Sequence, residues 1–428
     1  MDMTPYRGVL GLPGVRSLTL VGLIARIPVT ATGLTLTLHV TDSMKLGFTQ
    51  AGLVGTAATL GTAVGAPLAG RFVDRHGLRP VLLVTTAAQL VFWLAAPALP
   101  YYALLVAGAV AGLLSLPVFT VIRQCLAAMV PAERRRPAFA LDSMAVELSY
   151  MVGPAVAAAG VAALGSAWML IAVGVGLVGS GVVLFLLDPP IKSDAEREEE
   201  QAAGGAPSRR SWLTPGLVTL LGAVSALTFV LTATELSLVA TLTTAGATGL
   251  AGLVIGVWCL YSLIGGFVYG GLSREVSPLL LIGGLCALTA PLGLVGGGWW
   301  WLCLAILPSG LLCAPALSSS IDVVSRRVPA AARGEAMGLH STALTLGVAI
   351  GNPVAGAVID AYGPATAFAV TGLIGAAAVL LAVPFWRRHR TPAPLTPKAV
   401  PAEPGEAPRE IEPRRGHPAP ARSSSTAS

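Results

Sequence analysis

The chain has 428 residues, of which 54% are hydrophobic and 11% are charged, and its formal net charge is +6. Soluble domains contain about 25% charged residues, and a soluble protein of this length needs a more polar exterior to face water. The composition therefore excludes a cytosolic enzyme, a secreted disulfide-stabilised domain and a disordered protein. It indicates a protein for which the lipid bilayer is the main solvent.

Apolar segments long enough to cross a bilayer recur along the whole chain, since a spanning helix needs about 20 mostly apolar residues. The first of them is followed by many others, so it is predicted to be a span rather than a cleaved signal peptide. Six spans are expected in the first half, near residues 18–40, 50–70, 80–98, 101–124, 139–164 and 167–187. Six more are expected in the second half, near residues 214–241, 249–271, 278–297, 299–323, 335–359 and 365–386. The predicted fold class is an all-α integral membrane protein with twelve transmembrane helices.

Polar segments divide the chain into regions. Residues 191–212 contain the charged run DAEREEEQAAGGAPSRR and are expected to form a flexible linker. Residues 391–428 are rich in Pro, Glu and Ser and are expected to form a disordered tail. With a short N-terminal segment over residues 1–15, this leaves two six-helix bundles, residues 16–190 and 213–390.

The basic residues indicate the orientation in the membrane. All but two of the 27 lysines and arginines lie in or beside segments on one side; the exceptions are Arg26, inside the first span, and Lys45, in a loop on the other side. Because short cytoplasmic loops are enriched in Lys and Arg, the linker and both termini are expected in the cytoplasm. The positive charge is therefore interpreted as a topology signal, and no nucleic-acid partner is expected. A multi-pass protein of the plasma membrane is predicted.

Motifs of soluble enzymes and of metal sites do not occur in the sequence. There is no Walker-type phosphate loop, no His/Cys metal spacing and no Gly-x-Ser-x-Gly turn. The five cysteines stand singly inside apolar runs, which is typical of small buried apolar residues. We expect no enzyme activity, no metal and no cofactor.

The two halves repeat each other at a shift of 198 residues. This shift places Gly112–Pro117 on Gly310–Pro315 and Val130–Ala132 on Val328–Ala330, and it aligns Arg135 with Arg333. Shared apolar composition alone does not explain proline and polar matches in one register. The repeat predicts a six-helix unit that is duplicated in the same orientation.

The loop between the second and third predicted spans reads GRFVDRHGLRP. Gly70 permits close helix packing and Gly77 a tight turn, and Asp74 can accept hydrogen bonds from a helix N-terminus. The loop resembles the Gly-x-x-x-Asp-Arg-x-Gly-x-Arg signature of the major facilitator superfamily. The residues assigned to this gating loop are Gly70, Arg71, Asp74, Arg75, Gly77 and Arg79.

The resemblance implies two six-helix halves, cytoplasmic termini, a central linker and a substrate site near the bilayer midplane between the halves. It also implies that Asp74 contacts the start of the eleventh helix near Gly334 to Gly338 and closes the cytoplasmic side. The alternative is a basic cytoplasmic loop with an incidental aspartate. The corresponding loop of the second half, Gly270 to Pro278, keeps only traces of the signature.

Ionisable residues inside predicted spans are candidates for function, because each is costly in hydrocarbon unless it is paired or hydrated. Arg26 and Glu147 each lie about eight residues from the cytoplasmic end of a span, which places both roughly 12 Å deep. The superfamily fold places these two spans side by side. An ion pair between Arg26 and Glu147, with Asp142 as a further member, is predicted to bind protons; a static pair that pins two helices is the alternative.

Further candidates line the expected substrate cavity or the helix contacts. Glu235, His340 and Asn352 are the cavity candidates, although Glu235 could instead reach the outer interface. Drug–proton antiporters of the superfamily carry an arginine in the fourth helix, and residues 103–114 contain none, which weakens an antiport assignment. Small residues and prolines that allow close packing or bending of helices are Gly153, Pro154, Gly351 and Pro353.

The predicted function is secondary active transport of a small molecule by alternating access. A mostly apolar cavity favours proton-coupled efflux of a hydrophobic or amphipathic compound, and a small polar metabolite such as a sugar or carboxylate is the alternative substrate. A non-transporting sensor or scaffold on a transporter fold is the alternative from another class. The expected partners are the substrate, protons and the lipid bilayer, and the protein is expected to be a monomer.

Overall fold

The computed structural model describes residues 4–46, 48–202, 208–247, 250–272, 275–294 and 298–388. Residues 1–389 are joined by their contacts into one compact unit. The expected tail, residues 391–428, lies outside the described residues.

The first half is built from membrane-length helices close to the six expected spans. The fourth of them is broken before Pro117, because a residue that precedes proline is disfavoured in the helical conformation and proline has no N–H to donate. The helices are α2 (Val15–Leu38), α3 (Phe48–His76), α4 (Leu78–Ala95), α5 (Tyr101–Leu113) with α6 (Val118–Met129), α7 (Arg135–Leu164) and α8 (Ser166–Leu187).

The second half repeats this plan. Across the described residues, eleven segments are long and apolar enough to cross a membrane, and the span expected at 278–297 is a shorter apolar helix, Pro278–Leu294. Its α-helical part ends at Thr289, two residues before Pro291, and continues as a 3₁₀ turn. The helices are α11 (Pro215–Thr244), α12 (Ala251–Gly270), α13 (Pro278–Thr289), α14 (Trp299–Ala305) with α15 (Leu307–Arg327), α16 (Arg333–Tyr362) and α17 (Pro364–Arg388).

The predicted repeat is confirmed in detail by α7 and α16. Each helix has 30 residues, and the two begin at the aligned arginines, Arg135 and Arg333. Each ends at a glycine with positive φ, 82° at Gly165 and 84° at Gly363, a conformation that favours glycine over other residues. The shift of 198 residues therefore relates equivalent positions of these helices.

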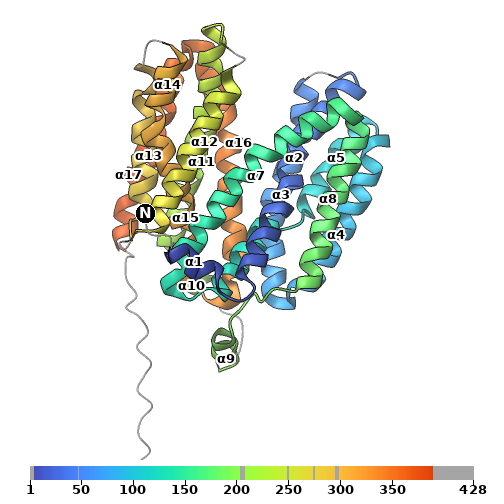
Figure 1. Ribbon diagram of the computed structural model, residues 1–428, viewed down its shortest axis with the longest axis vertical. Coiled ribbons are helices and arrows are strands. Elements are labelled where there is room, and N and C mark those ends of the chain that lie inside the picture. The colour runs from blue at the N-terminus through green and yellow to red at the C-terminus, as the bar shows by residue number, and fades with distance from the viewer. Residues whose placement is uncertain are drawn as a thin grey trace, which may run out of the picture. The chain divides into compact units, whose positions relative to one another are not determined.

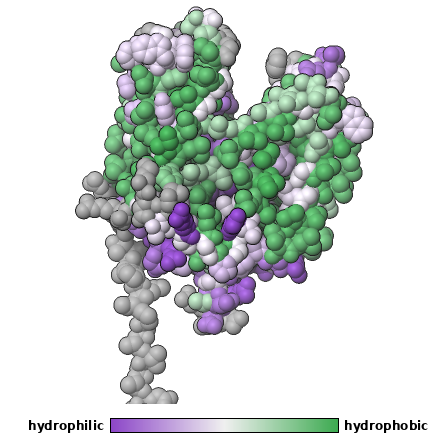
Figure 2. All heavy atoms as spheres, in the orientation of Figure 1, coloured by the Kyte–Doolittle hydropathy of each residue, from purple (hydrophilic) through white to green (hydrophobic). Residues whose placement is uncertain are grey.

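The two halves meet along the pairs α3–α16, α7–α12 and α7–α15. In Figure 1 the helices of residues 1–389 converge near α10 and diverge toward the opposite end. Figure 2 shows a hollow between the halves that is open at this opposite end, and hydrophilic residues gathered at the end where the helices converge. We call the latter the basic end. Large apolar side chains stay exposed on the outer helix faces, among them Leu186 and Leu381 at 72% and 73%, as expected for contact with lipid.

The linker between the halves is partly helical. Its described part contains two short helices, α9 (Asp194–Ala202) and α10 (Arg209–Trp212). Ser193 and Glu196 form a capping box at the start of α9: the Ser193 N–H donates to Glu196 Oε2 at 2.9 Å, and the Glu196 N–H donates to Ser193 Oγ at 3.3 Å. These reciprocal bonds explain why a charged segment is helical here.

Candidate functional site

Asp74, near the end of α3, joins the two halves at the basic end. Its Oδ1 accepts hydrogen bonds from the Gly334 N–H at 2.9 Å and from Gln124 Nε2 at 2.8 Å, and its Oδ2 accepts from the Glu335 N–H at 2.9 Å. The first N–H groups of a helix have no partner within the helix, and the helix dipole favours a negative charge beside them. The contact that the family resemblance predicted between Asp74 and the start of α16 is therefore present.

The backbones of α3 and α16 touch beside this contact. A Cβ on Gly70 would overlap the carbonyl oxygen of Gly334, and a Cβ on Gly338 would overlap the backbone at Ala66. Gly77 has φ +83° and forms the turn from α3 into α4. The positions expected to need glycine in this loop do need it, because any side chain would separate the helices or strain the turn.

The arginines of the same loop take different places. Arg79 Nε lies 3.1 Å from Asp188 Oδ2, and its guanidinium lies 5.5 Å from the centre of the Phe185 ring. Arg71 and Arg75 line a pocket of about 190 Å³ whose wall includes Glu335.

A second contact joins the two halves at the position that the repeat relates to the Asp74 contact. It was not predicted from the sequence. Arg136 Nη1 donates to the Leu272 carbonyl oxygen at 2.7 Å, and Arg136 Nη2 lies 3.5 Å from Glu275. Arg326 Nη1 lies 2.9 Å from the same carboxylate. In the repeat, Arg136 is aligned with Gly334, so the start of α7 meets the end of α12 as the start of α16 meets the end of α3. The repeat could have predicted this contact from the alignment of the helices, although the residues that form it differ from those at the Asp74 contact.

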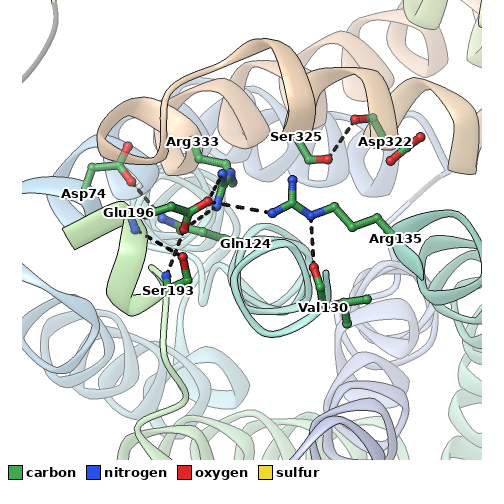
Figure 3. Close-up of polar contacts among 9 residues, drawn as sticks. All are labelled: Asp74, Gln124, Val130, Arg135, Ser193, Glu196, Asp322, Ser325 and Arg333. Atoms are coloured by element: carbon green, nitrogen blue, oxygen red, sulfur yellow. Dashed lines mark hydrogen bonds and ion pairs between the residues drawn. The ribbon is translucent and has the colours of Figure 1, made fainter. Parts of the chain in front are cut away.

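The linker forms a third contact, through Glu196 (Figure 3). Glu196 Oε1 lies 2.6 Å from Arg333 Nη2 and 3.8 Å from Arg135 Nη2, and Glu196 Oε2 accepts from Arg333 Nη1 at 3.3 Å. One carboxylate thus binds the two arginines that the repeat aligns, one from each half. Burial alone would raise the pKa of Glu196, but the hydrogen bonds and charge of Arg333, the Ser193 N–H and the charge of Arg135 hold that pKa below its ordinary value. We call Glu196, Arg333 and Arg135 the linker clasp.

The N-terminal helix α1 (Thr4–Leu10) adds a fourth contact. The Tyr6 hydroxyl donates to the Phe267 carbonyl oxygen, and the two rings stack with their centres 4.8 Å apart. Burial raises the pKa of Tyr6 to about 12. A Cβ on Gly270 would overlap this tyrosine. The N-terminal segment, predicted only as a short region before the first span, therefore packs against the second half.

The predicted ion pair between Arg26 and Glu147 is not present. Arg26 Nη2 lies 2.6 Å from Asp142 Oδ1, and Arg123 Nε lies 3.3 Å from Asp142 Oδ2. Asp142 and Glu147 are five residues apart on α7, so they point about 140° away from each other around the helix. Equal depth in the membrane did not make Arg26 and Glu147 neighbours, because Asp142 faces α2 and Glu147 does not.

Glu147 instead contacts the other half. Its Oε1 accepts hydrogen bonds from Ser262 Oγ at 2.9 Å and from Cys313 Sγ at 3.4 Å. Ser262 lies on α12 and Cys313 on α15, and Ser262 Oγ in turn accepts from the Ala314 N–H at 3.1 Å. A membrane-embedded carboxylate of the first half is thus held by donors of the second half.

Tyr150 and Glu235 lie on the hollow. Tyr150 is 58% exposed, yet it interacts electrostatically with Arg26, Arg123, Glu147 and Glu235. Glu235, on α11, is also exposed and lies close enough to Glu147 for their charges to interact. Tyr150 is exposed and has charges of both halves near it, which places it at the space between the halves, and Glu235 lies near the same group of charges. Glu235 was a cavity candidate, with the outer interface as the alternative; Tyr150 was not a candidate, although it stands three residues after Glu147, on a neighbouring part of the helix surface.

The cavity prediction for His340 is wrong in this conformation. His340 is fully buried, and its Nε2 lies 2.9 Å from Ser320 Oγ, between α16 and α15. Its position near a helix end suggested access, but α15 covers it. Asn352 is exposed on α16, and no described contact links it to the charged residues of the hollow.

The small residues predicted at helix contacts do mark close packing. A Cβ on Gly153 would overlap the Thr30 side chain of α2, and a Cβ on Gly351 would approach the Phe229 backbone of α11 within 2.8 Å. Pro154 and Pro353 lie inside α7 and α16, which continue through them.

Metal-ligating side chains do not cluster in the part of the chain that the structure describes: no three His, Cys, Asp or Glu residues could share an ion there. All five cysteines lie within that part, and none of them forms a disulfide.

Comparison with known protein families identifies the family of this chain. The family model of the Major Facilitator Superfamily matches residues 18–298 and 279–423. Among curated protein sequences, none matches the chain.

Solved structures share its fold at low sequence identity. The human organic anion transporter is 18% identical with a TM-score of 0.67, over 86% of this chain and 99% of that one. A bacterial homologue of the iron transporter ferroportin in an outward-facing state is 18% identical with a TM-score of 0.67, over 88% and 99%. A proton:xylose symporter is 15% identical with a TM-score of 0.65, over 87% and 96%. At these identities the likeness shows the fold alone.

Proposed function

This chain belongs to the major facilitator superfamily, and we propose from that premise that it exports a hydrophobic or amphipathic small molecule in exchange for protons. Members of this family are multi-pass membrane transporters, and the similar solved structures include transporters of an organic anion and of xylose. The observation that carries the proton-coupled mechanism is the contact of Glu147 with the opposite half.

The basic end is proposed to be cytoplasmic, in the plasma membrane. Its arginine-rich loops follow the positive-inside rule, and charged residues elsewhere in the described spans are few. With this orientation the hollow in Figure 2 opens to the outside, and the structure corresponds to an outward-facing state.

Alternating access then requires the contacts at the basic end to separate. Asp74 with the start of α16, Arg136 with the end of α12, and the linker clasp all join one half to the other or to the linker. Each contact is made of a few hydrogen bonds, worth roughly 1.5–3 kcal/mol where a charge takes part. Contacts of this size hold one state closed and can still be exchanged for contacts of the opposite state.

Glu147 is the proposed proton-coupling residue. As a carboxylate it accepts hydrogen bonds from Ser262 and Cys313 of the second half. Protonation removes the negative charge that strengthens both bonds, so α7 is released from α12 and α15. Glu235 and the exposed hollow give protons a route to this group from the outside.

Proteoliposomes loaded with a substrate panel test the proposal at two pH values. Wild-type flux should accelerate under a proton gradient, and Glu147→Gln should transport at a rate that no longer depends on the gradient. Glu133→Gln, an exposed glutamate beside the start of α7, serves as the control. Unchanged pH dependence in Glu147→Gln would refute coupling through this residue. If no compound is transported although the protein melts as a folded protein does, the alternative of a non-transporting sensor or scaffold would be favoured.

A further inference from the structure

Two buried arginines share one carboxylate inside the first half. Arg26 and Arg123 both bind Asp142, and their side chains are 1% and 4% exposed. Both guanidinium groups also lie over the Phe119 ring, 5.1 and 5.9 Å from its centre. We call Arg26, Arg123, Asp142 and Phe119 the arginine cluster. Two arginines share a single carboxylate in this cluster, so the cluster holds one positive charge in excess.

Donor atoms of the cluster are left unused. Arg26 Nε and Arg123 Nη1 are buried and have no hydrogen-bond partner among the residues that the structure describes, and the same holds for Nδ1 of His340. His340 lies near enough to Arg123 to act on it electrostatically. Buried polar groups in native proteins are nearly always bonded, and an unbalanced charge within the membrane is costly and marks functional sites. A cluster built only to pin helices would need one arginine, since one balances Asp142.

The cluster lies against the part of the second half that must move. Thr120 Oγ1 of α6 lies 3.5 Å from Ser341 Oγ of α16. Gln124, the neighbour of Arg123, donates to Asp74, which holds the start of α16. When that contact opens at the basic end, α16 moves away from α6 and uncovers the cluster from that side.

We propose that Arg26 and Arg123 bind the anionic group of the transported molecule when the basic end is open, and that the substrate is therefore an amphipathic anion, a carboxylate or sulfonate on an apolar body. This inference rests on the proposed transport function and specifies its substrate class. The planar guanidinium groups suit such an anion, since each can donate two parallel hydrogen bonds. Phe119 provides an apolar surface beside them.

The distribution of charge favours export of such a molecule. An anion entering from the basic end meets two arginines. In this conformation α16 lies against α6 through Ser341 and Thr120, and Glu235 is exposed near Glu147, where the two carboxylates repel an anion. Binding is thus favoured on one side and release on the other.

Three probes with the same apolar body test the charge requirement: 2-naphthalenesulfonate, 2-naphthol and (2-naphthyl)trimethylammonium. Titration calorimetry on the full-length protein should show the sulfonate binding at least tenfold more tightly than the other two. Arg123→Gln should weaken sulfonate binding about ten- to a hundredfold, the value of one charged hydrogen bond, and leave the neutral probe unchanged. Arg123→Lys, which keeps the charge and loses the planar fork, should bind the sulfonate with an affinity between those of wild type and Arg123→Gln. Arg16→Gln, an exposed arginine at the start of α2, is the matched control.

Thermal melting separates this site from a purely structural cluster. Arg123→Gln leaves a balanced pair of Arg26 and Asp142, so it should melt no lower than wild type. Asp142→Asn leaves two unbalanced arginines, so it should melt lower and regain stability, with tighter binding, when the sulfonate is added. Equal binding of the three probes, or sulfonate binding that Arg123→Gln and Arg123→Lys leave unchanged, overturns the inference.

Flux of the same probes separates this inference from the proposed function. Transport of 2-naphthol or the ammonium compound that exceeds transport of the sulfonate overturns the anion assignment and leaves the transporter in place. Sulfonate binding that depends on Arg123, without flux of any probe, supports the site and contradicts transport.

Discussion

Replacement of Glu196 by glutamine should open the basic end. The change keeps the side-chain shape and removes the charge that binds Arg333 and Arg135. Arg333 is 4% exposed and Glu196 17% exposed, so the interaction is only partly screened by water. Hydrogen bonds to a charged group contribute about 1.5–3 kcal/mol, and the two arginines would repel each other once the carboxylate is gone. The equilibrium should therefore shift toward the open basic end by about ten- to a hundredfold.

Hydrogen exchange measured by mass spectrometry reports this shift directly. The amides of Gly334 and Glu335 donate to Asp74 in the closed conformation, so they exchange only when the basic end opens. Exchange through such openings follows the population of the open form. Peptides that cover residues 333–340 should exchange about ten- to a hundredfold faster in Glu196→Gln than in wild type.

Glu198→Gln provides the control, because Glu198 lies on the same helix with an exposed side chain. A double-mutant cycle with Arg333→Gln should give a coupling free energy between the two positions of more than about 0.5 kcal/mol. Wild-type exchange rates in Glu196→Gln, or additive effects in the cycle, would show that the linker clasp does not hold the halves together.

The same exchange measurement checks three further predictions. Asp74→Asn removes the charge that binds two backbone N–H groups of α16, so exchange over residues 333–340 should rise at least tenfold; an unchanged rate would contradict the closing role. Gly70→Ala places a Cβ against the Gly334 carbonyl, so it should separate α3 from α16 and destabilise the closed state by about 1–3 kcal/mol, whereas a wild-type melting curve and exchange rate would show that the helices adjust freely. The pKa of Glu196 is lowered from its ordinary value of 4.5, so the clasp should be intact above pH 4.5 and lost as the pH falls through the lowered value; opening between pH 7 and 5 that Glu196→Gln abolishes would refute this.

The sequence predicted the features that depend on composition and local pattern. Hydrophobic length located the spans, and the repeat register located the equal helices α7 and α16. The loop signature led to the contact of Asp74 with Gly334, since both the carboxylate and its helix N-terminus have recognisable patterns. The capping box of Ser193 and Glu196 was equally readable, as Ser-x-x-Glu before a helix, and was missed in a segment that its charge marked as a linker.

The features that the sequence left open depend on direction around a helix. Arg26 was placed at the correct depth but with Glu147 rather than Asp142, because depth ignores the azimuth of a side chain. Arg123 was overlooked because it lies six residues before the end of α6, where a basic residue is expected to face the cytoplasm. His340 was expected in the cavity because its sequence position does not show that α15 covers it.

The two halves have equivalent helices, but their buried charged residues differ. This difference affects how the halves would work together. In the repeat, Arg123 is aligned with Ile321 and Asp142 with His340, so the ion pair of α6 and α7 has no counterpart in α15 and α16. The charged groups of the arginine cluster all belong to the first half, and the neighbouring groups on α16, His340 near Arg123 and Ser341 beside Thr120, belong to the second. In the proposed transport cycle, movement of the second half would change what the arginines face without breaking their bonds to Asp142. Opening of the basic end, the weak α6–α16 contact included, would then give access to the arginines while the costly buried charges stay paired with Asp142.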